Sequence, residues 1–195
     1  MSKENYCNLD NLDFSRVSVI GCPGSGKTTF TKSLGAVLNR TVIHLDKLLW
    51  GANWQMLSYN ERKTIHDGII YADNWLIDGM WKSHLTDRLN RATLVIFLDY
   101  KRRVSFWRAV KRRVKYSGCQ REDIADGCLE KLDSYFLHYI LSFRRKVRPV
   151  ILNELSLRQN LAVVTFKNPK QTERFLQYIK DRYKSPADIK MHSQS

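Results

Sequence analysis

A nine-residue segment, Gly21 to Thr29, has the residue types and spacing of a phosphate-binding loop. It matches the pattern G-x-x-x-x-G-K-[ST] without a mismatch. Its glycines allow the backbone to wrap a phosphate chain so that successive N–H groups point inward. In such a loop Lys27 reaches the β- and γ-phosphates, and the Thr28 hydroxyl is a ligand of Mg²⁺. The sequence therefore predicts a site for ATP and Mg²⁺. The predicted nucleotide-binding residues are Gly21, Pro23, Gly24, Ser25, Gly26, Lys27, Thr28 and Thr29.

Two acidic residues come directly after apolar segments that read as strands. Asp46 follows residues 41–45, where a carboxylate can accept the proton of a substrate hydroxyl or join the metal shell. Its alternative role is the N-cap of the following helix. Asp78 follows residues 75–77 and precedes Gly79, so we expect it to hold Mg²⁺ through water while the glycine lets a substrate approach closely. A simple turn is the alternative for this pair.

Residues 101–121 contain nine basic side chains and no acid. A solvated helix usually carries compensating acids one turn away, so their absence points to a polyanion. Arg112, Arg113 and Arg121 are predicted to be brought by a closing lid, at about residues 113–128, to the charge of the transferring phosphoryl group. A solvated surface charge is the alternative for each of them.

Other residues have two interpretations. The basic residues within 144–148 either reach back to the phosphates or favour the C-terminus of a helix. Trp50 and Trp54 either stack on a ring of the acceptor or belong to the core. His44 lies near the predicted site and is expected to pack at the end of its strand. The remaining tryptophans are predicted to be structural: Trp75, Trp81 and Trp107.

Apolar runs of strand length alternate with segments of helix length. The predicted strands are 16–20, 41–45, 75–77, 93–98 and 161–166, and the predicted helices are 28–38, 58–71, 85–91, 101–116, 129–146, a segment ending at 158, and 171–183. Such an alternation predicts an α/β protein whose parallel sheet is covered on both faces. Ligands bind these sheets at the carboxyl ends of the strands. We therefore expect Gly21, Asp46, Asp78 and Asp99 to meet in one crevice, although Asp99 alternatively caps the next helix.

Length, charge and hydropathy limit the class of protein. The chain has 195 residues and a net charge of +14, from 33 Lys+Arg and 19 Asp+Glu. One domain over residues 1–185 and a flexible tail over 186–195 are predicted. There is no apolar run of membrane-spanning length and no signal segment, so we expect a cytoplasmic protein without a membrane partner. The four cysteines contain no C-x-x-C pair and are predicted to be structural thiols.

With these motifs together, the chain resembles P-loop kinases of the adenylate kinase-like superfamily and, more narrowly, the DNA topology modulation proteins. The resemblance covers about residues 16–178 and rests on the loop at 21–28, His-Leu-Asp-Lys at 44–47, Trp-Leu-Ile-Asp-Gly at 75–79, Ile-Phe-Leu-Asp at 96–99, the basic residues of 108–113, and Arg-Glu-Asp at 121–123 leading to Gly-Cys at 127–128. It implies a parallel sheet of order 2-3-1-4-5, an acceptor region after the second strand and a short arginine-bearing lid. The Asp-Gly-Phe-Pro-Arg run of adenylate kinases is absent, because Met80 follows Gly79.

Two functions follow from these observations. The first is a kinase that transfers the γ-phosphoryl group of ATP to a nucleoside, nucleotide or similar hydroxyl metabolite, as a monomer or homodimer. Its predicted catalytic residues are Lys27, Asp46, Asp78, Arg112, Arg113 and Arg121, with Thr28 and Asp78 at the metal. The second is an ATP-binding regulatory or DNA-associated protein with weak or no transfer. The positive charge suits either partner, but no DNA-reading motif is present, which favours the kinase.

Overall fold

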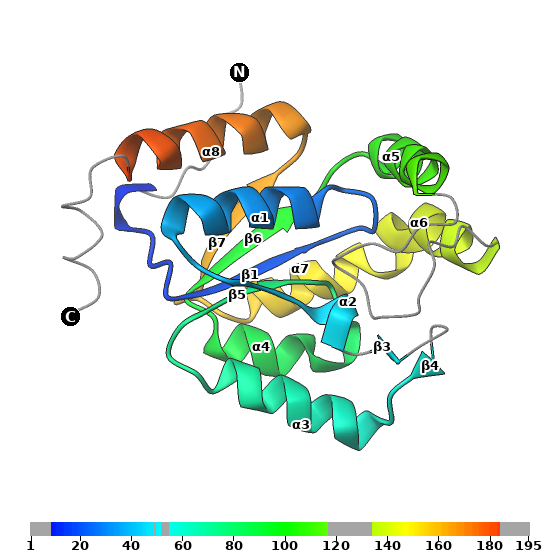
Figure 1. The fold of residues 1–195 in the computed structure, drawn as a ribbon, viewed down its shortest axis with the longest axis horizontal. Helices are drawn as coiled ribbons and strands as arrows, with labels where there is room; N and C mark the ends of the chain where they lie inside the picture. The colour runs from blue at the N-terminus through cyan, green and yellow to red at the C-terminus, as the bar shows by residue number, and fades with distance from the viewer. Residues whose placement is uncertain (1–8, 49, 52–54, 117–133, 184–195) are drawn as a thin grey trace.

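Five parallel strands form the central sheet of the protein (Figure 1). The computed structural model describes residues 9–48, 50–51, 55–116 and 134–183. Along the sheet the strands are β2 (Val42–His44), β5 (Trp75–Asp78), β1 (Arg16–Gly21), β6 (Leu94–Leu98) and β7 (Ala162–Phe166). In chain order this is 2-3-1-4-5, so the predicted topology is confirmed.

Helices cover both faces of the sheet because the side chains of each strand alternate between two apolar layers. The helices α1 (Lys27–Leu38) and α8 (Pro169–Arg182) lie over one face, as Figure 1 shows. The helices α3 (Tyr59–Ile70), α4 (Leu85–Arg91) and α7 (Arg148–Ser156) lie under the other. Val19 of β1 belongs to the first layer, whereas its neighbour Ile20 belongs to the second. The predicted three-layer α/β sandwich is therefore observed.

The carboxyl ends of the strands are surrounded by the elements that carry most of the predicted chemistry. They are α2 (Leu45–Leu48), the short antiparallel pair β3 (Trp50–Gly51) and β4 (Gln55–Met56), α5 (Arg102–Lys115) and α6 (Ser134–Lys146) (Figure 1). β1 and β5 run in register with Val19 opposite Asp78, and β1 and β6 with Gly21 opposite Leu98. This register places the phosphate loop between the ends of β5 and β6.

Local signals mark several helix boundaries. Ser58 accepts a hydrogen bond from the Glu61 N–H, and the Glu61 carboxylate accepts one from the Ser58 N–H, so the Ser-x-x-Glu sequence at the start of α3 forms a capping box. Asn168 caps α8, whose first residue is Pro169. These contacts are local in sequence, which is why sequence reasoning located the helices.

Some elements differ from the predictions. The helix α2 and the β3–β4 pair were not predicted, and neither were the 3-10 turns η1 (Leu9–Asn11) and η3 (Lys82–His84). All are too short for periodicity to detect. Of the helix predicted over 129–146, the first five residues lie outside the described part of the chain. Within the described residues, no helix has the length and apolar character needed to cross a membrane.

Candidate active site

The phosphate loop turns between β1 and α1 and is held against α5. Gly24 has a φ of +76°, and a Cβ at this position would overlap the carbonyl oxygen of Ser105 on α5. Only glycine fits such a conformation at so close an approach. The Ser25 N–H donates to the Cys22 carbonyl at 3.1 Å and closes the turn. Gly26, the N-cap of α1, provides no side-chain cap, so the first N–H groups of the helix remain available to an anion.

Lys27 and Thr28 begin α1 and both face the loop or the strand ends. The Lys27 ammonium donates to the Cys22 carbonyl at 3.2 Å, which places its charge over the loop. The Cys22 thiol beneath is buried, and burial raises its pKa to about 11. It is therefore neutral at physiological pH and does not oppose an incoming phosphate. Thr29 is exposed on the next position of α1.

Asp78, the last residue of β5, joins three elements at the site. One carboxylate oxygen, Oδ2, accepts the Thr28 hydroxyl at 2.7 Å and lies 3.0 Å from Nδ1 of His44. The other oxygen, Oδ1, is buried and has no hydrogen-bond partner among the described residues. A buried carboxylate oxygen without a donor is costly and calls for a missing partner. Asp78 thus stands at a turn, and its side chain also contacts Thr28 and His44 across the crevice.

This arrangement fits a hydrated magnesium ion. Mg²⁺ prefers oxygen ligands and keeps several of its waters. The Thr28 hydroxyl donates to Asp78, so its lone pairs face away from the carboxylate, and the orphaned Oδ1 can accept from a metal-bound water. The two residues predicted at the metal, Thr28 and Asp78, are therefore brought together by the fold.

His44 is a site residue whose role the sequence reasoning missed. It ends β2 directly opposite Asp78 in the parallel register, and its ring meets the carboxylate. A parallel pairing between the second and third strands was the signal available, because it places the last residues of the two strands side by side. His44 and Thr28 thus contact the same oxygen of Asp78, Oδ2, from two different elements.

Asp46 lies in the first turn of α2 and is exposed. It is inside the helix, and the next long helix is capped by Ser58, so the N-cap alternative is wrong. Burial raises the pKa of Tyr139 on α6 to about 12, and the negative charge of Asp46 adds to this shift. The Asp46 carboxylate therefore lies within electrostatic reach of Tyr139.

Among the basic residues of α5, Arg108 contacts the loop directly. Its Nη1 donates to the Ser25 carbonyl at 2.9 Å, and its guanidinium lies 5.7 Å from the ring of Tyr100. Arg112 and Arg113 are half-buried in the last turns of α5, with Arg112 lying 5.8 Å from the ring of Phe136 on α6. The first residues of the predicted lid, 113–115, are thus helical. Residues 117–128 of the predicted lid, including Arg121, lie outside the described residues.

Asp99 is the centre of an ion-pair cluster beside the site. Its carboxylate accepts Nε of Arg148 at 2.9 and 3.0 Å and the Lys167 ammonium at 2.6 Å. The N-cap position of the helix that follows is occupied by Lys101, whose side chain makes no capping hydrogen bond, so the cap alternative for Asp99 is wrong. Arg144 donates to the Tyr100 carbonyl at 3.3 Å. Arg144 in the last turn of α6 and Arg148 at the start of α7 therefore contact this cluster.

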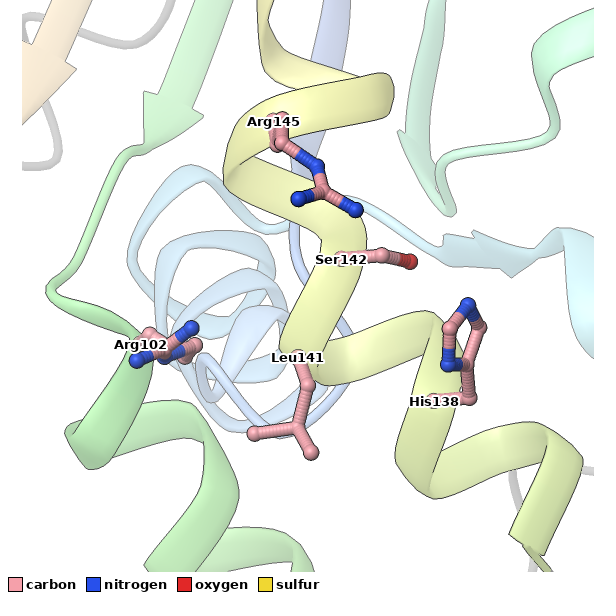
Figure 2. Close-up of a pocket in the computed structure, with 5 residues that line it drawn as sticks. All are labelled: Arg102, His138, Leu141, Ser142 and Arg145. Atoms are coloured by element: carbon pink, nitrogen blue, oxygen red, sulfur yellow. The ribbon is translucent and has the colours of Figure 1, made fainter.

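A separate basic hollow lies between the start of α5 and the middle of α6. It has a volume of about 230 Å³, and Figure 2 shows Arg102 across from four residues of α6. Those four are His138, Leu141, Ser142 and Arg145. None of these lining residues belongs to the phosphate loop, so this positive surface lies outside the loop.

The burial of the tryptophans differs in part from the prediction. Trp75 is buried in the core, and Trp81 packs with His66 and His84. Trp107, predicted to be structural, is 61 % exposed on α5, because its face of the helix points away from the loop. Trp50 is half-buried in β3. Trp54 lies outside the described residues.

Comparison with known proteins supports the fold. Neither a protein-family model nor a curated protein matches the chain. Among solved structures, a shikimate kinase from Bacteroides thetaiotaomicron is similar over 88 % of this chain and 99 % of its own, with a TM-score of 0.50 and 18 % identity. A gluconokinase from Sinorhizobium meliloti 1021 is similar over 93 % of this chain and 98 % of its own, with a TM-score of 0.50 and 14 % identity. At such identities the likeness establishes a shared P-loop kinase fold.

Proposed function

We propose that this chain is an ATP- and Mg²⁺-dependent kinase of a small hydroxyl-bearing metabolite. The observation that carries the proposal is the contact of Thr28, on the phosphate loop, with Asp78 at the end of β5. A phosphate loop alone occurs in many nucleotide-binding proteins. A carboxylate fixed beside its threonine, with an orphaned oxygen, supplies the second half of a magnesium site.

Each of the site residues has a role in this proposal. The loop N–H groups and Lys27 hold the phosphates. Thr28 and, through water, Asp78 would hold Mg²⁺, which would neutralise the charge of the phosphates. Asp46 accepts the proton of the acceptor hydroxyl. The oxygen of that hydroxyl forms a bond to the γ-phosphorus, while the bond between the γ-phosphorus and the bridging oxygen of ADP breaks. Arg112, Arg113 and Arg121 are assigned to the charge of the group in transfer.

The proposal also includes four predictions from the sequence on family, domain bounds, location and oligomeric state. They are membership of the DNA topology modulation proteins, a single domain over residues 1–185 with a tail at 186–195, a cytoplasmic location, and a monomer or homodimer. The acceptor class is a nucleoside, a nucleotide or, as the names of the structural neighbours suggest, a small hydroxy acid.

The proposal is tested by ADP release from Mg·ATP across a panel of acceptors. The panel includes nucleosides, nucleoside monophosphates, shikimate and gluconate. Lys27→Ala is expected to abolish acceptor-stimulated ADP release without loss of the fold, whereas Lys32→Ala, an exposed lysine on the same helix, serves as the matched control. A flat response to every acceptor, or full turnover in the Lys27 variant, would refute the kinase assignment.

A second candidate function is nucleic-acid binding by the outer face of α5. Arg103, Trp107 and Lys111 are exposed at intervals of four residues, so one aromatic ring lies between two cations, as in surfaces that stack bases and hold phosphates. Titration of a fluorescent single-stranded oligonucleotide tests it. The double variant Arg103→Ala, Lys111→Ala should lose binding and keep acceptor-dependent turnover; equal binding by both proteins rules this surface out.

A further inference from the structure

Arg88 on α4 is the largest of the fully buried side chains that the structure describes. No carboxylate among the described residues forms an ion pair with it, and burial alone lowers its pKa to about 10. The guanidinium therefore keeps its charge at neutral pH. A buried cation without a counter-ion is costly compared with an apolar side chain of similar volume. Its presence under the sheet calls for an explanation beyond packing.

The hydrogen bonds of Arg88 go to β1 and to the turn after β5. Nε donates to the Ser18 hydroxyl at 3.0 Å, and Nη2 donates to the carbonyls of Gly79 and Met80 at 3.2 and 3.3 Å. Gly79 and Met80 come directly after Asp78. A planar guanidinium that binds three acceptors constrains their relative positions more than a flexible ammonium does.

The same turn is also held from its other side. The Gly79 N–H donates to a carbonyl of β1 at 3.3 Å. Gly79 has a φ of +147°, and a Cβ there would lie 2.8 Å from Cβ of Leu45. Leu45 is fully buried and precedes Asp46. The turn thus begins at Asp78, touches the residue before Asp46, and is bound from below by Arg88.

We propose that Arg88 is a positioning residue of the phosphate site. Its guanidinium sets the path of the backbone at Gly79 and thereby the place of the Asp78 carboxylate beside the Thr28 hydroxyl. The buried charge is retained because two backbone carbonyls and one hydroxyl must be held at once. This inference rests on the proposed function, since it assigns Arg88 to the magnesium side of that site.

Two substitutions of Arg88 and one control on the same helix test the assignment. Arg88→Lys retains a cation with different bonding geometry, and Arg88→Met retains volume without donors. Arg91→Met is the matched control, because Arg91 lies one turn further along α4, where it donates to the Ile70 carbonyl at 3.5 Å and covers the ring of Tyr71. The measurements are the Mg²⁺ concentration for half-maximal binding of a fluorescent ATP analogue, kcat and KM, and the thermal unfolding of each protein.

Both Arg88 variants are expected to need about 10-fold more Mg²⁺ for half-maximal binding, the low end of the effect of losing an outer-shell partner of a metal site. Their kcat should fall with little change in the KM for ATP, and the lysine should not rescue the loss. Arg91→Met should match the wild type in both respects. An unchanged Mg²⁺ requirement in folded Arg88 variants, even with a lower Tm, would overturn the proposal and leave Arg88 a structural residue.

A further variant tests the proposal if the Arg88 variants do not fold. Ser18→Ala removes only the hydroxyl that accepts from Nε of Arg88. We expect this variant to raise the Mg²⁺ requirement by a smaller factor than the Arg88 variants do. An unchanged Mg²⁺ requirement would count against the proposal. The binding measurement needs no acceptor. If wild-type protein shows Mg²⁺-dependent ATP binding but transfers to no acceptor, the kinase proposal fails while the positioning role of Arg88 is still decided.

Discussion

Thr28 and Asp78 stand 50 positions apart in the sequence and meet through a 2.7 Å hydrogen bond at the ends of α1 and β5. The parallel pairing of β1 with β5 places Asp78 level with Val19, two residues before the phosphate loop. The loop then returns the chain toward the sheet, so the first turn of α1 comes to the end of β5. The sheet register therefore determines where the metal site of the proposed kinase forms.

Asp78→Asn should weaken the use of Mg²⁺ much more than the binding of free ATP. An amide keeps the volume of the side chain but replaces one acceptor oxygen by a donor, which conflicts with either the Thr28 hydroxyl or a metal-bound water, depending on its orientation. We expect an increase of about 10- to 100-fold in the Mg²⁺ requirement, the range for outer-shell partners. Mg²⁺ titration of nucleotide binding checks this, and an unchanged requirement would remove Asp78 from the metal site.

Asp46→Asn should reduce kcat by about 100- to 10,000-fold, the usual contribution of a general base. Because Asp46 is exposed on α2 rather than within the phosphate loop, the affinity for Mg·ATP should stay within about twofold. Steady-state kinetics and equilibrium binding on the same preparation measure both quantities. Comparable losses in turnover and affinity would instead place Asp46 in the nucleotide site.

Gly24→Ala should abolish nucleotide binding or destabilise the loop, because its Cβ would occupy the space of the Ser105 carbonyl at a positive φ. Gly68→Ala is the matched control: Gly68 is exposed within α3 and nothing lies within 4 Å of its added Cβ. This control should raise the free energy of unfolding by about 0.5–1 kcal/mol. Chemical denaturation and ATP binding decide the comparison, and normal binding by the Gly24→Ala variant would contradict the assigned loop geometry.

Acid should destabilise the protein through His66. Burial, then the positive charges of Arg88 and His84, lower its pKa from 6.5 to about 4, while Asp67 acts weakly in the opposite direction. The unfolded chain takes up the proton near pH 6.5 and the folded protein only near pH 4. The free energy of unfolding should therefore be constant above about pH 6.5 and fall by about 3 kcal/mol on acidification to pH 4, at 1.36 kcal/mol per pH unit.

Urea denaturation of wild type and His66→Phe between pH 4 and 8 measures this effect. The phenylalanine retains a ring beside Trp81 and His84. It removes two buried nitrogens that lack a hydrogen bond of normal length to the described residues, although Nδ1 lies 3.7 Å from the Asp67 carboxylate. The variant should show a shallower pH dependence. Some slope should remain, because the pKa of His84 is also lowered by burial. Identical slopes in the two proteins would show that His66 is not the titrating group.

Local sequence was sufficient for the fold class and for the phosphate loop. Continuous apolar runs such as 94–98 require a covered parallel sheet, and the spacing of glycines, Lys27 and Thr28 requires a strand before them and a helix after them. The capping box at Ser58 and Glu61 was readable for the same reason. In each case the residues that interact are near one another in the chain.

The tertiary structure decided which side chains meet across the sheet. His44 against Asp78, Arg108 against the Ser25 carbonyl, and Asp99 among the cations that follow α6 and β7 are pairings between distant segments. The sequence contained these residues but not the sheet register that joins them. Arg88 shows the same limit, because a charged residue in a helix is normally exposed. Only the packing of α4 under β1 and β5 reveals that its guanidinium is buried and bound to the turn that carries Asp78.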